Sequence, residues 1–384
     1  MAVKSSKICF FAPGAYPLLT GRDLRNIIGP DIHQILLAKE LLKYNFEISF
    51  IVYESQSDLI EYIDGIKIIK IDNNLKYNLK ILSFIHKILN IFSALYESKA
   101  QIYFQHGSGG CAISIYCKIF NKKCIYYIGS DALVDRNLIT QKNKEFNESF
   151  FSANNLFNIV NIKLADVVVV QNEYQKNLIT KFKREGTLIK KHLVLTEREA
   201  PNKSNPPVVL WVGSLAEVKR PDIFAMLAEA IPEAIFQMIG GYVHGNKELH
   251  DHILEKSKIV PNLKYLGVIA FDEINPYFKN ASILVNTSLF EAYPPYAFLQ
   301  AWMNYVPVVS IGDNSEEIIN RYGLGFHSVN IDQMIIDIKT LLNNNELRMK
   351  MGQNGRQYVE RECDINKIGM LYAEIFNKLT AESA

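Results

Sequence analysis

The chain has 384 residues, a formal net charge of +2 and 48% hydrophobic residues. This length exceeds one ordinary core, and about 150 residues per domain predicts two or three domains, of which we expect two. The near-neutral charge excludes a strong general attraction to nucleic acid, although a weakly basic face remains open. The composition is that of a globular protein.

Cysteine usage and hydropathy indicate the compartment. The cysteines are odd in number and form no CxxC pair, which argues against a disulfide framework or a zinc site. They are Cys9, Cys111, Cys117, Cys124 and Cys363. We expect no secretory signal after MAVKSSK and no membrane span, which would need about 18 apolar residues in a row. A reduced, cytoplasmic location is predicted.

The first half alternates short apolar runs with helical stretches. Strands are predicted at residues 7–12, 46–53, 66–71, 101–104, 123–128 and 166–170. A turn-rich loop, 13–30, follows the first strand, and Asp31 is predicted to cap a helix that runs to Tyr44. Runs such as VVVV at 167–170 are typical of parallel strands covered by helices on both faces. This half is predicted to be a doubly wound α/β domain.

The same pattern restarts after residues 196–207, a polar segment that lacks periodicity, ends in two prolines and is the predicted linker. Strands are predicted at 208–212, 234–239, 262–267, 282–285 and 306–310, and helices at 221–230, 331–342, 346–361 and 365–379. The predicted domains are 1–195 and 206–363, with a C-terminal helix, 364–384, that packs back toward the first. Ligands are expected in a cleft between the two sheets, at the carboxyl ends of the strands.

Residues 288–312 contain an acidic loop between a strand and a helix. Glu291 lies in the loop, and Pro294 and Pro295 are predicted to start the helix, since proline is favoured at the first helical position. Free amides at Ala297 and Phe298 would then form a binding position for an anion. A carboxylate beside a phosphate position predicts chemistry on a phosphorylated, hydroxyl-rich ligand.

A basic turn, WVGSLAEVKRPD, occupies residues 211–222. Gly213 makes the turn, and Lys219 and Arg220 precede a helix that is predicted to begin at Pro221. Two cations at a helix amino end repel its dipole, so a bound anion would relieve an unfavourable placement. The alternative is a solvated basic turn, because charged residues are mostly exposed anyway.

These segments resemble the donor-binding half of GT-B glycosyltransferases of the large retaining family 4, also called group 1. The resemblance covers most of residues 206–360, through VGSLAEVKRP, FQMIGG, YLGVIAFDEI and SLFEAYPPYAFLQAW in that order. The first half resembles the family more weakly, through GPDIHQILLAKEL, IGSD and VVVVQNEYQ. The implied fold is GT-B, in which two doubly wound Rossmann-like domains face each other across a cleft.

The resemblance implies a retaining, metal-independent hexosyltransferase with a UDP- or GDP-linked sugar donor and no other cofactor. Lys219, with Arg220, would neutralise the leaving diphosphate. Glu291 would match the first acid of the family's paired-glutamate motif, which holds the hydroxyls of the donor sugar. The acceptor would be a glycan or a lipid-linked molecule, as in surface polysaccharide assembly.

The resemblance also assigns donor binding to residues of both halves. They are Gly213, Ser214, Arg220, Gly240, Val268, Tyr293, Ala297, Phe298 and Gln300, with Gly14 in the first half. Ser214 stands where the family often has arginine, and Gln300 replaces the second glutamate one residue later than the family's spacing. Glutamine can still hydrogen-bond a ribose diol, without charge assistance. A non-catalytic regulatory or binding subunit and a sugar-nucleotide epimerase are the alternatives.

Polar residues follow two strands of the first half. His106, in QHGSGG, is a candidate sugar or acceptor contact, or else an exposed residue of a helix-capping loop. Ser130 and Asp131 lie near the position where the family often carries a histidine, although Asp131 is equally suited to cap a helix. Gly14 belongs to the loop that faces the donor diphosphate in the family, or it simply forms a turn.

Residues 77–96 are predicted to form an apolar helix. Because apolar residues nearly encircle it, a core helix is favoured. The alternative is a face that rests on an anionic bilayer, where lipid-linked acceptors reside. Five basic residues would add to such a face: Lys181, Lys183, Arg184, Lys190 and Lys191. We expect a cytoplasmic protein, with peripheral contact with the plasma membrane as the alternative and without a nucleic-acid partner.

Overall fold

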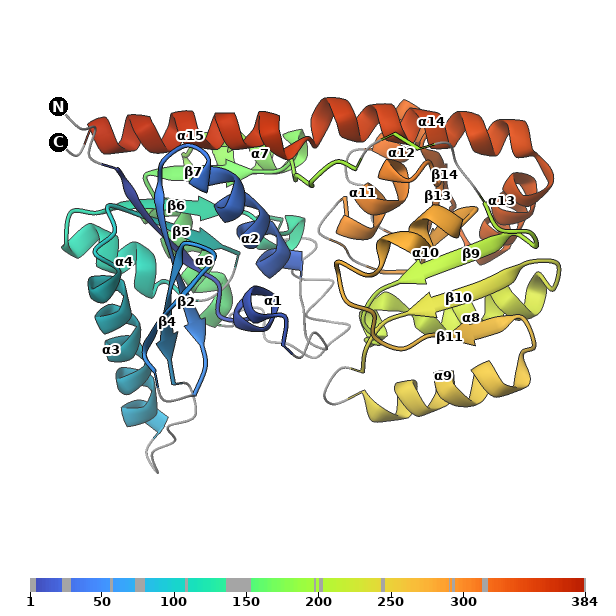
Figure 1. Ribbon diagram of the computed structural model, residues 1–384, viewed down its shortest axis with the longest axis horizontal. Helices are drawn as coiled ribbons and strands as arrows, with labels where there is room; N and C mark the ends of the chain where they lie inside the picture. The colour runs from blue at the N-terminus through green and yellow to red at the C-terminus, as the bar shows by residue number, and fades with distance from the viewer. Residues whose placement is uncertain are drawn as a thin grey trace. The chain divides into compact units, whose positions relative to one another are not determined.

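The computed structural model describes residues 5–382 apart from 23–28, 56–57, 73–79, 108–109, 136–152, 197, 200–202, 243–245, 290, 292–293 and 313–316. The chain divides into two compact units (Figure 1). The first unit holds the described residues up to His192 and those from Ile365 onward, and the second holds Leu193–Asp364. Each unit has a sheet covered by helices on both faces, as predicted.

In the described part of the first unit, the sheet has eight strands in the order β3-β4-β2-β1-β5-β6-β7-β8. They are β1 (Lys7–Phe11), β2 (Glu47–Tyr53), β3 (Ile60–Ile63), β4 (Ile66–Ile71), β5 (Ile102–His106), β6 (Lys123–Tyr127), β7 (Val167–Val170) and β8 (Gly186–Leu188). All pairs are parallel except β3 with β4. Asp64 and Gly65 both have positive φ, 49° and 80°, and form this hairpin's two-residue turn. The Asp-Gly pair is therefore a local sequence signal for β3, a strand that was not predicted.

Helices cover both faces of this sheet. They are α1 (Tyr16–Thr20), α2 (Gly29–Leu42), α3 (Lys80–Ser98), α4 (Ala112–Ile119), η2 (Asp131–Leu133), α6 (Ala153–Leu164), α7 (Glu173–Ile179), η3 (Thr180–Phe182) and α15 (Ile365–Ala381). Helices α1, α2 and α15 share one core, and α3, α4, α6 and α7 share the other. Two expectations were wrong: α1 lies within the predicted loop 13–30, and Asp31 belongs to the first turn of α2 rather than to its cap. The reason is local, since Pro17 is the second residue of α1 and Pro30 is already helical.

The described residues of the second unit form a fully parallel six-stranded sheet in the order β11-β10-β9-β12-β13-β14. The strands are β9 (Val208–Val212), β10 (Ile235–Ile239), β11 (Leu263–Tyr265), β12 (Ile283–Asn286), β13 (Val308–Ser310) and β14 (Gly325–His327). Strand β14 was not predicted, because three residues beginning with glycine carry no alternation. Gly325 is required there, since a Cβ atom would lie 1.8 Å from the carbonyl oxygen of Val308.

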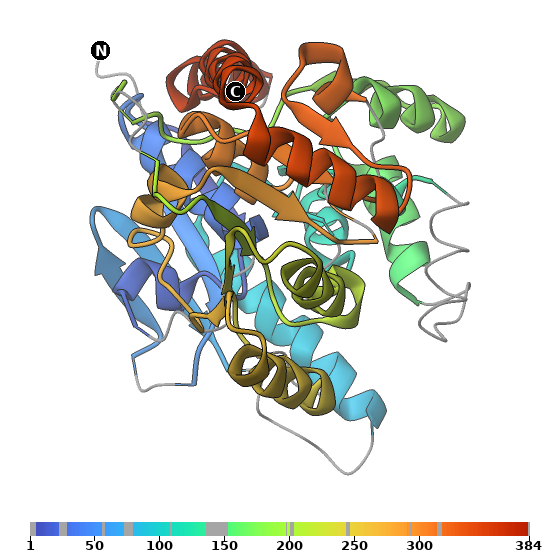
Figure 2. The ribbon, with the colours of Figure 1, turned by 90° about the vertical axis from the view of Figure 1, so that its right-hand side faces the viewer.

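The helices of the second unit also form two layers. They are η4 (Glu217–Lys219), α8 (Pro221–Ala230), α9 (Lys247–Ile259), α10 (Asn275–Asn280), α11 (Tyr296–Met303), α12 (Ile318–Tyr322), α13 (Ile331–Asn343) and α14 (Asn345–Glu362). Helices α8, α9 and α13 pack on one core, and α10, α11, α12 and α14 on the other. Figure 2 shows α8 and α9 side by side. Helix α9 was missed because Ile253 is its one fully buried residue among largely polar neighbours.

The described part of the predicted linker, 196–207, packs on the second unit. Arg356, 4% exposed, donates hydrogen bonds to the carbonyl oxygens of Thr196 and Met303, at 2.6 and 2.8 Å. Lys203 Nζ donates to the carbonyl oxygen of Asn304 at 2.8 Å, and burial lowers the pKa of this amine to about 7. This segment therefore belongs to the second unit instead of forming a free connection.

Candidate functional site

The turns after β9 and β10 lie in close contact at the carboxyl edge of the second sheet. Gly213 follows β9, and Gly240 follows the neighbouring parallel strand β10. A Cβ atom on Gly240 would lie 1.7 Å from the carbonyl oxygen of Gly213, so any other residue would force the two turns apart. The turn after β9 is thereby held in place, and it leads through Ser214 into η4 and Lys219.

Arg220 connects η4 to α8 in the left-handed conformation, with φ 48° and ψ 53°. This conformation costs a residue other than glycine roughly 1–2 kcal/mol. The guanidinium group forms an ion pair with Asp222, with Nη2 2.8 Å from Oδ2. Arg220 already has a carboxylate partner, so its contact with a phosphate stays a prediction.

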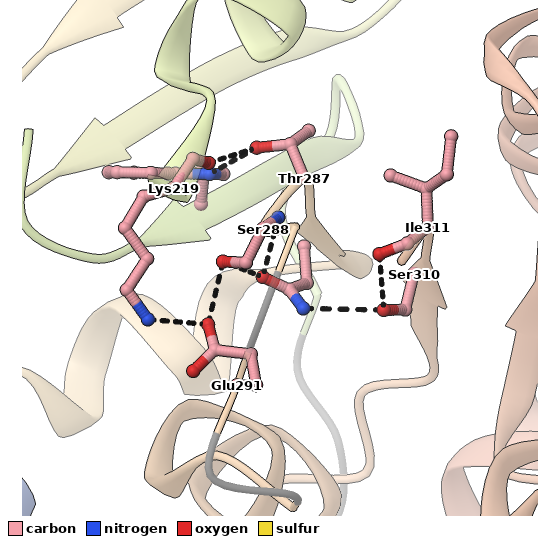
Figure 3. A network of polar contacts seen from close by, with 8 residues as sticks. Lys219, Thr287, Ser288, Glu291, Ser310 and Ile311 are labelled. Carbon is pink, nitrogen blue, oxygen red and sulfur yellow. Dashed lines mark hydrogen bonds and ion pairs between the residues drawn. The ribbon is translucent and has the colours of Figure 1, made fainter. Parts of the chain in front are cut away.

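Lys219 and Glu291 meet in one site, although they are 72 residues apart in the sequence. Lys219 Nζ lies 2.6 Å from Glu291 Oε1, and Ser288 Oγ lies 2.6 Å from the same oxygen (Figure 3). The side chains of Lys219 and Glu291 are 24% and 12% exposed. Among the described residues, Glu291 Oε2 has no hydrogen-bond partner, which makes it the oxygen available to a ligand.

The loop that carries Glu291 is connected to two strand ends. Ser288 Oγ also lies 2.8 Å from Asn286 Oδ1, and Asn286 Nδ2 donates to Ser310 Oγ at 3.3 Å (Figure 3). Asn286 ends β12 and Ser310 ends β13. The amide of Ser288 also donates to Asn286 Oδ1 at 3.3 Å, so the loop that carries Glu291 is connected to the end of β12 and, through Asn286, to the end of β13.

Helix α11 begins differently from the sequence prediction. Pro295 is its N-cap residue, with φ −61° and ψ 153°, and the first helical residue is Tyr296. The amide of Phe298 donates to the carbonyl oxygen of Pro295 at 3.0 Å, so the expectation of a free amide there was wrong. Ala297 stays a predicted phosphate contact, and Gln300 is buried in the helix. Tyr293 lies outside the described residues.

The remaining donor-site prediction in this unit, Val268, lies beyond the end of β11. The amide of Gly240 donates to the carbonyl oxygen of Gly267 at 2.9 Å, and Tyr265 Oη donates to the carbonyl oxygen of Gly240 at 2.8 Å. Val268 follows and is 41% exposed. The ends of β9, β10 and β11 therefore form one connected edge that carries Gly213, Gly240 and Val268.

The candidates of the first unit lie at the carboxyl ends of its strands. Gly14 follows β1, and a Cβ atom there would lie 2.5 Å from Asp31 Oδ2. The imidazole of His106, which ends β5, packs on Gly129, where a Cβ atom would lie 2.5 Å from the ring. Ser130, at the next position, is half-buried. Gly14, His106 and Ser130 thus share the edge of the sheet where doubly wound folds bind ligands.

Asp131 has a structural role. It is 1% exposed, and its Oδ1 accepts hydrogen bonds from Gln175 Nε2 at 2.6 Å and Asn172 Nδ2 at 3.2 Å. Asn172 is the N-cap residue of α7, and its Oδ1 accepts from the amide of Gln175 at 2.7 Å. Asp131 therefore connects η2 to the start of α7 without being the N-cap residue of α7, and its contact with a sugar stays a prediction.

A cluster of buried histidines surrounds His106 and was not recognised in the sequence. The rings of His33 and His106 are 5.1 Å apart, and those of His33 and His192 are 4.4 Å apart. Burial lowers the pKa of His33 well below its usual value, that of His106 to about 3 and that of His192 to about 4. Burial also raises the pKa of Asp31, in the first turn of α2, to about 6. These imidazoles are therefore neutral at pH 7.

The sequence carries no local signal for this cluster, because His192 lies 159 residues after His33. Among the described residues, neither ring nitrogen of His33 has a hydrogen-bond partner. In the same part of the chain, no group of three or more histidine, cysteine or acidic side chains is arranged to hold a metal ion.

Part of the chain matches a known protein family, and a larger part matches a relative. Residues 195–358 match the family of glycosyl transferases group 1. The chain is 26% identical over 239 residues to an uncharacterized glycosyltransferase of Methanocaldococcus jannaschii, a match that covers 61% of this chain and 62% of the relative's own length.

Two solved structures show the fold over nearly the whole chain. Sucrose-phosphate synthase from Thermosynechococcus elongatus superposes with a TM-score of 0.78 at 14% identity, over 98% of this chain and 100% of that chain. HepE of Anabaena, in complex with UDP and glucose, superposes with a TM-score of 0.71 at 13% identity, over 97% and 100% of the two chains.

The fold is that of the GT-B glycosyltransferases, with two Rossmann-like units that each contain a largely parallel sheet. Within this fold, residues 195–358 are similar to the glycosyl transferases of group 1.

Proposed function

We propose that the chain is a retaining, metal-independent hexosyltransferase that transfers a sugar from a UDP- or GDP-linked donor to a glycan or lipid-linked acceptor in surface polysaccharide synthesis. The observation that carries this proposal is the 2.6 Å contact between Lys219 and Glu291 at the carboxyl edge of a parallel sheet. A cation beside a carboxylate suits a ligand that has a diphosphate at one end and sugar hydroxyls at the other. The similarity to HepE, solved with UDP and glucose, supports a uridine diphosphate donor.

In the proposed reaction Lys219 acts on the leaving group and Glu291 on the sugar. The bond between the anomeric carbon and the diphosphate oxygen breaks, and the electron pair stays on the oxygen, whose charge Lys219 stabilises. Glu291 Oε2 accepts a hydrogen bond from a sugar hydroxyl. The acceptor hydroxyl then bonds to the anomeric carbon from the same face, and its proton passes to the departing phosphate oxygen.

A binding screen followed by a turnover assay tests this function. UDP-, GDP-, ADP- and CMP-sugars are added in a thermal-shift experiment, where a ligand at 100-fold excess over its Kd stabilises the native state by about 2.7 kcal/mol. We expect a higher Tm with a UDP- or GDP-sugar, and release of the nucleoside diphosphate from it. Binding without turnover would favour a non-catalytic subunit, conversion without an acceptor would favour an epimerase, and no shift at all would refute the donor site.

Helix α3 supports the proposal of a lipid-linked acceptor. Its inner face packs in the core through Ile91 and Leu95, as the favoured interpretation predicted. The outer face is also apolar, which that interpretation did not foresee: Leu82, Ile85, Leu89 and Tyr96 are 46–72% exposed. No helix in the described ranges is long and apolar enough to cross a bilayer.

The end of α4 extends this surface. Helices α3 and α4 lie side by side (Figure 1), and Ile119 and Phe120 at the end of α4 are 62% and 48% exposed. Lys87 of α3 and Lys118 of α4 are exposed on the same two helices. Exposed apolar side chains next to lysines suit the headgroup region of an anionic bilayer. We propose that this surface makes peripheral contact with the inner face of the plasma membrane.

Vesicle sedimentation tests the surface. The chain is expected to sediment with phosphatidylcholine vesicles that contain phosphatidylserine, and less well at high salt. Replacing Ile85 and Leu89 together by glutamate should lower the bound fraction about tenfold, since it removes apolar burial and adds like charge. Ile259→Glu, a change of the same kind at a 75% exposed position of the second unit, is the control. Equal sedimentation of the double variant and the wild type would contradict the proposal.

A further inference from the structure

Thr287 lies where the two parts of the candidate site meet. It follows β12, is 1% exposed, and its Oγ1 accepts a hydrogen bond from Trp211 Nε1 at 3.0 Å. The same oxygen donates to the main-chain carbonyl oxygen of Lys219 at 2.8 Å (Figure 3). Because an indole N–H only donates and a carbonyl only accepts, the direction of the hydroxyl proton is determined: it points at Lys219.

Two other contacts connect the same segments. The amide of Leu289 donates to the carbonyl oxygen of Val218 at 2.9 Å, and Lys219 Nζ pairs with Glu291 at 2.6 Å. Residues 287, 289 and 291 of one loop therefore contact residues 218 and 219 of the other. The turn that carries the cation and the loop that carries the carboxylate form one assembly.

The turn needs such support because of the residue that follows Lys219. Arg220 has a positive φ of 48°, and its neighbours must keep this unfavourable conformation in place. The Lys219 carbonyl belongs to the peptide plane between the two residues. A hydrogen bond to this carbonyl therefore fixes ψ of Lys219 and φ of Arg220 together, and with them the direction in which the Lys219 side chain leaves the backbone.

We propose that Thr287 is a positioning residue, which directs Lys219 toward the diphosphate of the donor; this inference rests on the proposed function. Thr287 does not contact the ligand and acts through the Lys219 carbonyl. Trp211 assists because its indole N–H donates to the hydroxyl oxygen of Thr287. The hydroxyl proton is then left to donate to the carbonyl oxygen of Lys219. No local pattern indicates this role, since Trp211 lies 76 residues and Lys219 lies 68 residues before Thr287.

Calorimetric titration of Thr287→Val tests the role without an acceptor. The probe is whichever of UDP, GDP and ADP the wild type binds most tightly, with the matching nucleoside as the comparison. Valine keeps the size of threonine but lacks the hydroxyl. We expect the affinity for the nucleoside diphosphate to fall about tenfold because the ammonium group is displaced, while nucleoside affinity is unchanged.

Three further variants separate positioning from a general loss of stability. Thr287→Ser keeps the hydroxyl and should restore the affinity for the diphosphate. In a Lys219→Ala background, Thr287→Val should have no further effect, because the residue acts through the lysine. Thr340→Val is the matched control: its hydroxyl donates to the carbonyl oxygen of Ile336 at 2.8 Å on an exposed part of the same unit, and its loss should change nothing.

The outcomes distinguish this inference from the proposed function. Unchanged diphosphate affinity in Thr287→Val, or additive losses with Lys219→Ala, would overturn the positioning role alone. Unchanged affinity in Lys219→Ala, or a wild type that binds none of the three diphosphates, would refute the proposed function and with it the inference. If Thr287→Val does not fold, its combination with Trp211→Phe, which also removes the donor left unpaired, replaces it.

Discussion

Sugar transfer is expected to fall by at least about a hundredfold when Lys219 or Glu291 is replaced by alanine, the loss typical of removing one group that stabilises transition-state charge. Without Lys219, the leaving diphosphate loses its cation. Without Glu291, the sugar loses its hydrogen-bond acceptor and Lys219 loses its 2.6 Å partner. Initial rates of nucleoside diphosphate release from the donor measure the effect, and circular dichroism checks that the fold is retained.

A second ion pair of the same unit provides the control. Lys256 of α9 pairs with Glu229 of α8, and the two side chains are 35% and 42% exposed. Lys256→Ala and Glu229→Ala remove the same charges as Lys219→Ala and Glu291→Ala. Both control positions are far in sequence from the loops of the site. Turnover should stay at the wild-type level there, because exposed ion pairs contribute little. Normal turnover in both Lys219→Ala and Glu291→Ala would refute the site.

Acidification from pH 7.5 to pH 5 is expected to destabilise the first unit through His33, His106 and His192. In the unfolded chain these imidazoles titrate near pH 6.5, whereas burial depresses their pKa in the fold. The unfolded state therefore binds more protons below pH 6.5, and stability is lost as the pH falls from about 6.5 toward 4.

Asp31 acts in the opposite direction. Its pKa is raised to about 6 in the fold, so the folded state binds its proton first and gains stability as the pH falls below 6. At pH 5 each buried imidazole costs the fold about 2 kcal/mol, and Asp31 offsets about 1 kcal/mol. Three imidazoles outweigh one carboxyl group, so the net change is a loss of several kcal/mol.

The chain offers a way to observe the two units separately. Both tryptophans, Trp211 and Trp302, are buried in the second unit, so their fluorescence in urea reports on that unit alone. Hydrogen exchange of α2 and β5 peptides reports on the first unit. We expect lower protection there at pH 5 and a much smaller shift of the fluorescence midpoint.

Single histidine variants assign the effect. His33→Phe removes one titrating imidazole, which lies beside the rings of Phe104 and Tyr127. This variant should reduce the pH dependence of the first unit's stability by about a third. His252→Gln changes an exposed histidine of the second unit and should leave the pH dependence unchanged. Equal protection of α2 and β5 at both pH values in the wild type would contradict the prediction.

Elements with a strong local pattern were predicted closely. The helix at 221–230 and the strands at 208–212 and 66–71 have the predicted bounds, because apolar runs and a starting proline mark them locally. Strand β14 has three residues and α9 is mostly exposed, so neither carries a clear apolar period. The start of α11 was misjudged because Pro295, whose ψ is 153°, is the cap and not the first helical residue.

The sequence by itself determined that this chain has two doubly wound α/β units, and it marked Lys219 and Glu291 as functional candidates. Alternation, turn residues and family motifs are local, and each can be read within a few residues of the element it specifies. The tertiary structure alone decided which of these residues meet. The Lys219–Glu291 pair, the Thr287 contact and the histidine cluster all join residues between 68 and 159 positions apart. Such contacts follow from strand order and from the packing of helices on the sheets, which no local pattern encodes.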